Sequence, residues 1–325
     1  MPLAVMTDQL GPPENYSLRE HDPGAPGAGE VRMRIRAAGI SYVDVLTAAG
    51  NYQVKPPVPF IPGSECAGVV EAVGDGVTGF APDDEVVASG WGGLFAEVAV
   101  LPAKMLQPKP AGLDFAEAAV FPVSYATAWH ALVDRGQLKA GETLLVLGAG
   151  GATGFAAVQV GKHLGARVIV LASSDEKRAL ALAGGAGAAI DGRAEDWRDQ
   201  VKAANGGKGV DVVFDPVGGA MTEAAFRSLG WNGRHLIIGF PAGMTALRTN
   251  LALIKGASLI GVDIRQFGIF EATKADANRK TIFALAGSDG LRPAIAHRYL
   301  LAEWKAAMEA AASGESAGRI VLIME

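Results

Sequence analysis

A glycine-rich stretch between residues 147 and 154 carries the strongest chemical signal in the chain. It reads Leu-Gly-Ala-Gly-Gly-Ala-Thr-Gly, follows an apolar segment at residues 143–147 and opens a segment with helical spacing at residues 152–164. Glycines permit a sharp turn and let backbone N–H groups approach a pyrophosphate, and the start of a helix adds unpaired N–H donors and partial positive charge. A purely structural turn is the alternative. The flanking strand and helix favour a dinucleotide site.

The residues after the next apolar strand, at residues 167–171, indicate which nicotinamide dinucleotide is bound. An acidic side chain at this point would hold the ribose 2′-hydroxyl of NAD. The chain has Ser173 and Ser174 instead, with Lys177 one helical turn later. Two hydroxyls and a cation suit a 2′-phosphate, which needs donors and positive charge, so we expect NADPH rather than NADH. Ser174 can also be the N-cap of the next helix, and the two roles are compatible.

The elements around these residues alternate between strand and helix. Expected strands occupy residues 143–147, 167–171, 210–214 and 235–238, and expected helices occupy residues 152–164, 175–183 and 221–229. The strands are apolar throughout, as in a parallel sheet that is buried on both faces. This alternation predicts a doubly wound α/β domain, with the glycine turn at the end of its first strand.

The first part of the chain has a different pattern, in which short strands are separated by turns. Expected strands lie at residues 30–36, 68–72 and 85–88, between turns that contain Gly and Pro. This pattern predicts a mostly β catalytic domain at residues 1–122. The dinucleotide-binding domain is expected at residues 123–262. Residues 263–325, which end in a helix and a strand, are expected to return to the catalytic domain.

Composition limits the kind of protein this can be. Half of the 325 residues are hydrophobic and 19% are charged, which provides enough apolar surface for sizeable cores. The formal net charge is −5 and the basic residues are scattered, so we expect no nucleic acid partner. No apolar run is long enough for a membrane span and no secretion signal is apparent, so we expect a soluble cytoplasmic protein. The single cysteine, Cys66, excludes an intramolecular disulfide and a cysteine-rich zinc site.

With these motifs in view, the chain resembles the zinc-free quinone oxidoreductase (zeta-crystallin-like) family of the medium-chain dehydrogenases and reductases. The similarity covers essentially the whole length, with motifs at residues 37–44, 62–74, 92–97, 127–132, 148–154, 211–219 and 318–322. The resemblance implies a doubly wound Rossmann cofactor domain, a GroES-like catalytic domain and a homodimer. It also implies an activity, the transfer of hydride from NADPH to a quinone.

Zinc-dependent relatives differ from this chain at their metal site. Where those enzymes have a metal-binding Cys, this chain has Ser41, and where they have Gly-His-Glu it has Gly63, Ser64 and Glu65. A catalytic zinc needs about three protein ligands of His, Cys or carboxylate type. The loss of both the thiolate and the imidazole predicts an enzyme without a metal.

The resemblance also implies which residues hold the cofactor. Thr127 and Phe240 would lie beside the nicotinamide, Gly150, Gly151, Ala152, Thr153 and Gly154 would hold the pyrophosphate, and Ser173, Ser174, Lys177 and Arg193 would hold the adenosine phosphate, with Arg319 completing the set. Family members usually have Asn where this chain has Ser41, and a Tyr that contacts the 2′-phosphate where it has Gly192. The NADPH prediction therefore needs Arg193 to compensate for the missing Tyr.

In such an enzyme the nicotinamide carries the hydride, and the protein must stabilise the negative charge that develops on the acceptor oxygen. Candidate donors are Ser41 and Tyr52, with a packing role as the alternative for Tyr52. Asp44 follows Ser41 at helical spacing, which indicates a capping or ion-pair role, and Glu65 is expected to make an orienting hydrogen bond. Large aromatic side chains are candidates for a flat pocket, with a place in the hydrophobic core as the more frequent alternative: Phe60, Trp91 and Phe267.

Two other functions stay open at this point. The acceptor could be an activated alkene, as for an enoyl or haloacrylate reductase, with the same cofactor. The chain could also be a cofactor-binding structural or RNA-associated protein, since crystallin relatives have been recruited in that way. An acidic chain without a basic stripe disfavours RNA.

Overall fold

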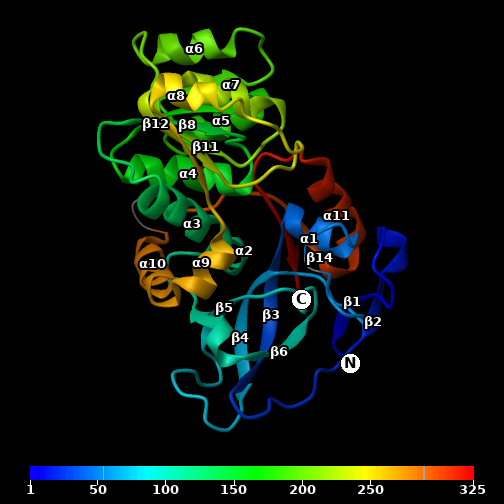
Figure 1. The fold of residues 1–325 in the computed structure, drawn as a ribbon. Helices are drawn as coiled ribbons and strands as arrows, with labels where there is room; N and C mark the ends of the chain where they lie inside the picture. The colour runs from blue at the N-terminus through cyan, green and yellow to red at the C-terminus, as the bar shows by residue number, and fades with distance from the viewer. Residues whose placement is uncertain (54, 288–289) are drawn as a thin grey trace. The chain divides into compact units, whose positions relative to one another are not determined.

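The computed structural model describes residues 1–53, 55–287 and 290–325, and Figure 1 shows the fold. The chain divides into two compact units, and each sheet belongs to one of them. Met1–Val123 and Arg292–Glu325 form the first unit, and Ser124–Leu291 form the second. Among the described residues, no helix has the length and apolar character that a membrane span requires.

The second unit contains a six-stranded, fully parallel sheet with the order β10-β9-β8-β11-β12-β13. The strands are β8 (Thr143–Leu147), β9 (Arg167–Ala172), β10 (Ala188–Asp191), β11 (Val210–Asp215), β12 (Leu229–Ile237) and β13 (Ser258–Gly261). The helices are α3 (Pro122–Trp129, of which the second unit contains the residues from Ser124 onward), a π-helical turn (His130–Arg135), α4 (Ala152–His163), α5 (Asp175–Ala183), α6 (Trp197–Ala204), α7 (Ala220–Ser228), α8 (Asn250–Lys255), α9 (Ile264–Phe270) and α10 (Ala272–Leu285). The order and directions confirm the predicted doubly wound sheet.

Alternate side chains of the parallel strands enter two different cores. Leu145 of β8 packs with Trp197 of α6 and Phe226 of α7 in one buried cluster. Leu144 points to the opposite face, where a Cβ on Gly161 of α4 would lie 2.6 Å from its Cδ2 atom. Helices therefore cover both faces of the sheet, which is why its strands are apolar throughout.

β8 and β11 lie side by side in the middle of this sheet, and the chain moves outward from them in opposite directions. From β8 it continues through β9 to β10 at one edge, and from β11 through β12 to β13 at the other. Such a reversal opens a crevice at the carboxyl ends of the two central strands, where doubly wound proteins bind their ligands. The glycine turn that follows β8 lies at this point.

The first unit contains a two-stranded antiparallel sheet and a seven-stranded sheet. The larger sheet has the order β14-β15-β3-β4-β5-β7, with β6 paired to β3 and with β14 and β15 in parallel. The strands are β1 (Leu3–Met6), β2 (Ser17–Glu20), β3 (Glu30–Ile40), β4 (Glu65–Val73), β5 (Glu85–Ser89), β6 (Val98–Pro102), β7 (Leu106–Pro108), β14 (Ile295–Leu300) and β15 (Arg319–Ile323). The helices are α1 (Tyr42–Ala48), α2 (Phe115–Val120) and α11 (Trp304–Ser313), with 3₁₀ turns at Pro13–Asn15, Ala103–Met105 and Leu301–Glu303.

The long strand β3 forms the centre of the first unit's core. Met33 and Ile35 are fully buried, whereas Arg34 and Arg36 are exposed, as the two-residue period of a strand requires. The same core contains Trp304 of α11, so the C-terminal helix packs on the first part of the chain. β15 pairs with β3 and completes this return.

Helices α9 and α10 belong to the segment that is predicted from the sequence to return to the catalytic domain, and they lie in the second unit. Asp134 in the π-helical turn pairs with Lys274 Nζ at 2.9 Å and accepts a hydrogen bond from Asn278 Nδ2 at 2.6 Å. Phe267 of α9 stacks on His130, with ring centroids 3.7 Å apart. These contacts join distant parts of the chain, so local sequence patterns do not reveal them.

Candidate cofactor site and acceptor pocket

The turn between β8 and α4 has the geometry that the glycine pattern predicts. Gly148 has a φ of 59°, in the left-handed region that glycine adopts without strain. A Cβ on Gly154 would lie 2.3 Å from the Gly148 carbonyl oxygen, so the absence of a side chain lets α4 approach the end of β8. The N–H groups of the first turn of α4 are thereby brought to the carboxyl edge of the sheet.

Gly151, the N-cap residue of α4, is a glycine that the fold itself does not require. Its φ of −89° suits any residue, and a Cβ there would meet its nearest atom, the Gly148 oxygen, at an ordinary 3.4 Å. Gly151 is exposed, and no side chain caps the helix at this end. The result is an open cradle at the N-terminus of a 12-residue helix, a place that favours phosphate.

The side chain of Lys177 reaches the glycine turn from α5. A Cβ on Gly150 would lie 2.4 Å from Cγ and 2.6 Å from Cβ of Lys177, so the aliphatic stem of the lysine passes over the glycine. Ser174 is the N-cap of α5, and its hydroxyl accepts a hydrogen bond from the Lys177 N–H at 3.3 Å. The capping role of Ser174 is thus confirmed. Ser173 is exposed and follows β9, the strand next to β8.

Two arginines lie beyond the end of β9. Arg193 is largely exposed, and its guanidinium pairs with Asp191 at 3.2 Å. Arg178 of α5, which no sequence motif indicates, donates to the Ala172 carbonyl at 3.1 Å and lies 3.5 Å from Asp191. A helical Arg next to Lys177 looks like a solvated residue in the sequence, and only the fold places it at the last residue of β9.

Asp215, the last residue of β11, organises the loop that follows it. It is fully buried and accepts hydrogen bonds from the N–H groups of Val217 and Gly218 at 3.0 and 2.9 Å. Thr222 Oγ1 donates to its other oxygen at 2.8 Å, and His235 Nε2 lies 3.0 Å from that oxygen. Burial raises the pKa of Asp215, but the hydrogen bonds from His235 and Gly218 outweigh burial and lower the pKa below its usual value.

Phe240 follows β12 and is half exposed. A Cβ on Gly218 would lie 2.7 Å from Phe240 Cα, and a Cβ on Gly148 would lie 2.8 Å from Cγ2 of Val217. The loops after β8, β11 and β12 therefore pack against one another at the carboxyl edge of the sheet. Phe240 lies in this group of loops, next to the loop after β11 that packs against the glycine turn.

Thr127 lies on α3 and is 6% exposed. Two residues earlier, Tyr125 donates a hydrogen bond from its hydroxyl to Gln159 of α4 at 2.5 Å. This buried hydrogen bond ties α3 to the helix that the glycine turn opens. Thr127 is thus carried by a helix that is fixed relative to the cradle.

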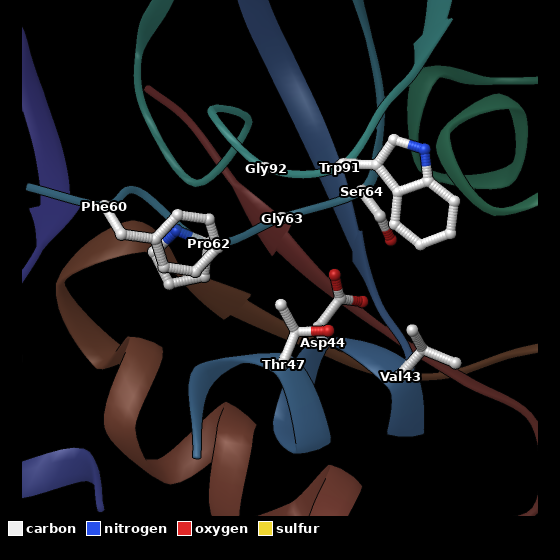
Figure 2. Close-up of a pocket in the computed structure, with 9 residues that line it drawn as sticks. All are labelled: Val43, Asp44, Thr47, Phe60, Pro62, Gly63, Ser64, Trp91 and Gly92. Carbon is white, nitrogen blue, oxygen red and sulfur yellow. The ribbon is translucent and has the colours of Figure 1, made fainter. Parts of the chain in front are cut away.

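The first unit has a small pocket of its own, shown in Figure 2. Its walls come from α1, from the loop before β4 and from the loop after β5. The side chains that define it are Val43, Asp44, Thr47, Phe60, Ser64 and Trp91. The walls are mostly apolar and aromatic, with a few polar atoms among them.

Ser41 and Asp44 form the capping box that begins α1. The Ser41 hydroxyl and N–H donate to Asp44 Oδ2 at 2.6 and 2.8 Å, and the Asp44 N–H donates back to Ser41 Oγ at 3.2 Å. The predicted capping role of Asp44 is confirmed. Asp44 also lines the pocket, whereas Ser41 is not among the described residues that line it.

Glu65 and Arg319 form a buried ion pair in the first unit. Arg319 Nη2 lies 3.1 Å from Glu65 Oε1, and the Val123 N–H donates to Glu65 Oε2 at 3.0 Å. Burial raises the pKa of Glu65, Arg319 opposes the rise and the nearby Asp44 adds to it. The orienting hydrogen bond expected of Glu65 is present. Arg319, predicted to bind the cofactor, is placed here as the counter-ion of Glu65.

Tyr52 stacks on Trp91, with ring centroids 6.2 Å apart and 26° between the ring planes. Phe60 and Trp91 both line the pocket, as the prediction of a flat aromatic site expects. Phe267 belongs to the second unit, where it stacks on His130. The contact with Trp91 gives Tyr52 the packing role that the sequence analysis kept as its alternative.

Two family models match the chain. The alcohol dehydrogenase GroES-like domain matches residues 27–111, and the zinc-binding dehydrogenase domain matches residues 152–278. Quinone oxidoreductase-like protein 2 of Mus musculus is 37% identical over 261 residues, which are 80% of this chain and 74% of the relative. Quinone oxidoreductase of Homo sapiens is 30% identical over 326 residues, 99% of this chain and 97% of the relative. The chain belongs to the quinone oxidoreductase family.

A solved structure extends this similarity. The quinone oxidoreductase of Thermus thermophilus, also solved in complex with NADPH, is 31% identical, covers 99% of each chain and has a TM-score of 0.85. The predicted combination of a doubly wound Rossmann domain with a GroES-like domain is confirmed. As a quinone oxidoreductase family member, the chain is an oxidoreductase of the medium-chain type.

The name of the second family model raises the question of a zinc ion in this quinone oxidoreductase homologue. Within the described ranges, no group of three His, Cys, Asp or Glu side chains is arranged to hold a metal ion. Ser41 and Ser64 present hydroxyls where zinc-dependent relatives have thiolate and imidazole, and both are hydrogen-bonded to Asp44. These residues do not fit a catalytic zinc.

Proposed function

We propose that the protein is an NADPH-dependent reductase that transfers hydride to a quinone without a metal ion. The observation that carries the proposal is the cradle at Gly151, where the fold has room for a side chain and the chain has none. A backbone that must approach a pyrophosphate at a helix N-terminus needs this opening. Membership of the quinone oxidoreductase family and the NADPH complex of a relative support the same conclusion.

NADPH fits the charges around this cradle. The pyrophosphate would contact the N–H groups of the first turn of α4, whose dipole favours a negative ligand. Lys177 and Ser173 supply the cation and the hydroxyl that a 2′-phosphate needs. Arg178 and Arg193 add positive charge beyond β9, and each of them also forms an ion pair with Asp191. Thr127 and Phe240 are proposed beside the nicotinamide and Arg319 near the cofactor, on the family resemblance.

Bound NADPH supplies a hydride from its nicotinamide ring. The residues of the chain bind the acceptor, orient it and keep water away from it. In the pocket, Phe60 and Trp91 offer flat surfaces for a planar ring, and Thr47 and Ser64 bring hydroxyls that can meet its oxygen. An acceptor reduced in this way must be electron-poor, because no metal polarises it.

Oxidation of NADPH by the purified protein tests the proposal. A quinone and an α,β-unsaturated ketone are offered side by side, with and without a metal chelator, and NADPH loss is followed by absorbance. We expect turnover with the quinone, faster with NADPH than with NADH and unchanged by the chelator. Turnover with the alkene alone would reject the quinone as acceptor, and inhibition by the chelator would reject the metal-free mechanism.

The proposed enzyme is a homodimer. β13 is an edge strand of the six-stranded sheet. Exposed apolar side chains gather on β13 and on the neighbouring β12 and α8: Trp231, Leu253, Ile254 and Leu259. Protein surfaces seldom leave such an edge open to solvent. A second copy of the same edge would cover it. The cytoplasmic location stays a prediction from the sequence.

A further inference from the structure

The pocket of the first unit contains a buried acid to which the proposed function gives no role. Asp44 is 4% exposed, yet its carboxyl is part of the pocket wall. Among the described residues that line the pocket, it is the one side chain that can ionise. Figure 2 shows it pointing from α1 toward Ser64, with Phe60 on one side of the view and Trp91 on the other. A carboxyl in such surroundings is a candidate for acid chemistry.

The hydrogen bonds around Asp44 hold its carboxyl in one orientation. Ser41 donates to Oδ2 through both its N–H, at 2.8 Å, and its hydroxyl, at 2.6 Å. Ser64, which lines the pocket, is hydrogen-bonded to the same carboxyl. Oδ2 therefore accepts the hydrogen bonds that cap the helix. The carboxyl group borders the pocket next to Ser64.

The charges around Asp44 do not balance if every group is ionised. Asp44, Glu65 and Arg319 are all buried, and Arg319 pairs directly with Glu65 at 3.1 Å. One cation cannot compensate two buried carboxylates, so the cluster is nearest to neutral when one carboxyl keeps its proton. Burial raises the pKa of Asp44, against hydrogen bonds from Ser41 and Ser64 and the charge of Arg319. Since Glu65 holds the ion pair, Asp44 is the carboxyl whose neutral form burial favours.

We propose that Asp44 is the catalytic acid of this reductase and gives its proton to the acceptor oxygen in the pocket, while Ser41 positions its carboxyl. The inference rests on the proposed function, because it requires an acceptor that receives hydride. Asp44 then has the role of proton donor that was predicted for Ser41 and Tyr52. The cap explains how a buried acid can be held rigidly at the pocket wall.

Reduction of a quinone to a hydroquinone consumes one hydride and one proton. The hydride would come from bound NADPH, which would be left as NADP⁺. The O–H bond of Asp44 breaks as an O–H bond forms on the acceptor, which leaves Asp44 as a carboxylate near Arg319. A proton from water restores the acid after the hydroquinone has left.

The Asp44→Asn variant tests the inference, because an amide keeps an oxygen for Ser41 but has no acidic proton. We expect kcat with the quinone to fall about 100-fold, a usual contribution of a general acid, with the KM for NADPH unchanged. Wild-type kcat should fall as pH rises through the pKa of Asp44, and the variant should lose this dependence. Glu65 and Arg319 are the charged groups that face Asp44, from β4 and β15, and both are unchanged in the variant.

Glu117→Gln is the matched control. Glu117 is the carboxyl of the capping box that begins α2, in the same N3 position as Asp44 in α1, and it lies outside the pocket. Its replacement should lower the stability of the protein and leave the pH dependence of kcat as in the wild type. Comparison of Asp44→Asn with Glu117→Gln distinguishes the effect of losing a helix cap from the effect of losing an acidic proton.

A wild-type rate and pH profile in Asp44→Asn would show that Asp44 is a cap only, and the inference would be wrong. If the variant does not fold, wild-type kinetics in D₂O decide. Slower quinone reduction in D₂O together with the fall at high pH supports the inference, and the absence of both overturns it. Failure of the proposed function looks different, because wild-type protein would then bind no NADPH and reduce no quinone.

Discussion

Gly151 is a position where the need for glycine comes from the proposed ligand and not from the fold. Replacing it with Ala places a methyl group in the cradle without a clash inside the protein, since the nearest atom would lie at 3.4 Å. We expect Gly151→Ala to change the free energy of unfolding by less than about 1 kcal/mol. We expect its affinity for NADPH to fall about tenfold or more, a loss of about 1.4 kcal/mol. Denaturant unfolding and calorimetric titration measure the two quantities.

Gly154→Ala is the control variant for Gly151→Ala. Its Cβ would lie 2.3 Å from the Gly148 oxygen, so α4 would have to move away from β8. The expected result is a clear loss of stability, from strain between the helix and the strand. Should Gly151→Ala prove the less stable of the two and still bind NADPH normally, the cradle is a structural turn.

Lys177 is expected to distinguish NADPH from NADH. Its stem crosses Gly150 and its ammonium is the cation nearest in sequence to Ser173 and Ser174. Loss of a hydrogen bond to a charged group costs about 1.5–3 kcal/mol, so Lys177→Ala should raise the KM for NADPH about tenfold and leave that for NADH unchanged. Steady-state kinetics with both dinucleotides check this, with Lys202→Ala on the exposed side of α6 as control. An equal effect on both cofactors would show that Lys177 does not contact the 2′-phosphate.

The sequence predicts those candidate site residues whose signal is local. The glycine turn and Lys177 follow from a strand, a turn and a helix that lie next to one another in the chain. Asp44 was expected as a helix cap, and its place in a pocket depends on residues 60–64 and 91–92 folding against α1. Arg178 was missed because its contact with Ala172 exists only once α5 packs beside β9.

The loop after β11 is held by a buried carboxylate, and its stability should therefore depend on pH. The folded-state pKa of Asp215 is lowered, so its stabilising effect is complete above the unfolded value, about 3.9, and is lost as pH falls through the folded value. Asp215→Asn should lower the free energy of unfolding at neutral pH by about 2 kcal/mol. The difference from wild type should shrink as the pH falls below about 4. Denaturant unfolding across this pH range measures it, and a difference that stays constant with pH would contradict an ionised Asp215.

Whole elements of the second unit follow from the alternation of apolar strands and helices, because each strand is buried on both faces. The assignment of α9 and α10 to the second unit does not follow from this alternation. Their place is set by Asp134, which binds Lys274 and Asn278, and by the stacking of Phe267 on His130. Such contacts between distant residues leave no periodic pattern in the sequence.

For the whole molecule, the open edge at β13 predicts how two copies associate. Leu259 lies on the edge strand and is half exposed. A lysine there would be buried without a partner in a dimer, so Leu259→Lys should shift the protein from dimer to monomer. Sedimentation or light scattering measures the mass, with Leu182→Lys on α5 as a control at another exposed leucine. A wild-type protein that is already monomeric would contradict the proposed dimer.

Binding of NADPH to the purified protein is the measurement on which the proposed reductase function depends. Isothermal titration calorimetry of the wild-type protein with NADPH and, separately, with NADH measures it without any assumption about the acceptor. We predict saturable binding of NADPH that is tighter than that of NADH. If neither dinucleotide binds, the turn between β8 and α4 is not a cofactor site and the reductase function is wrong.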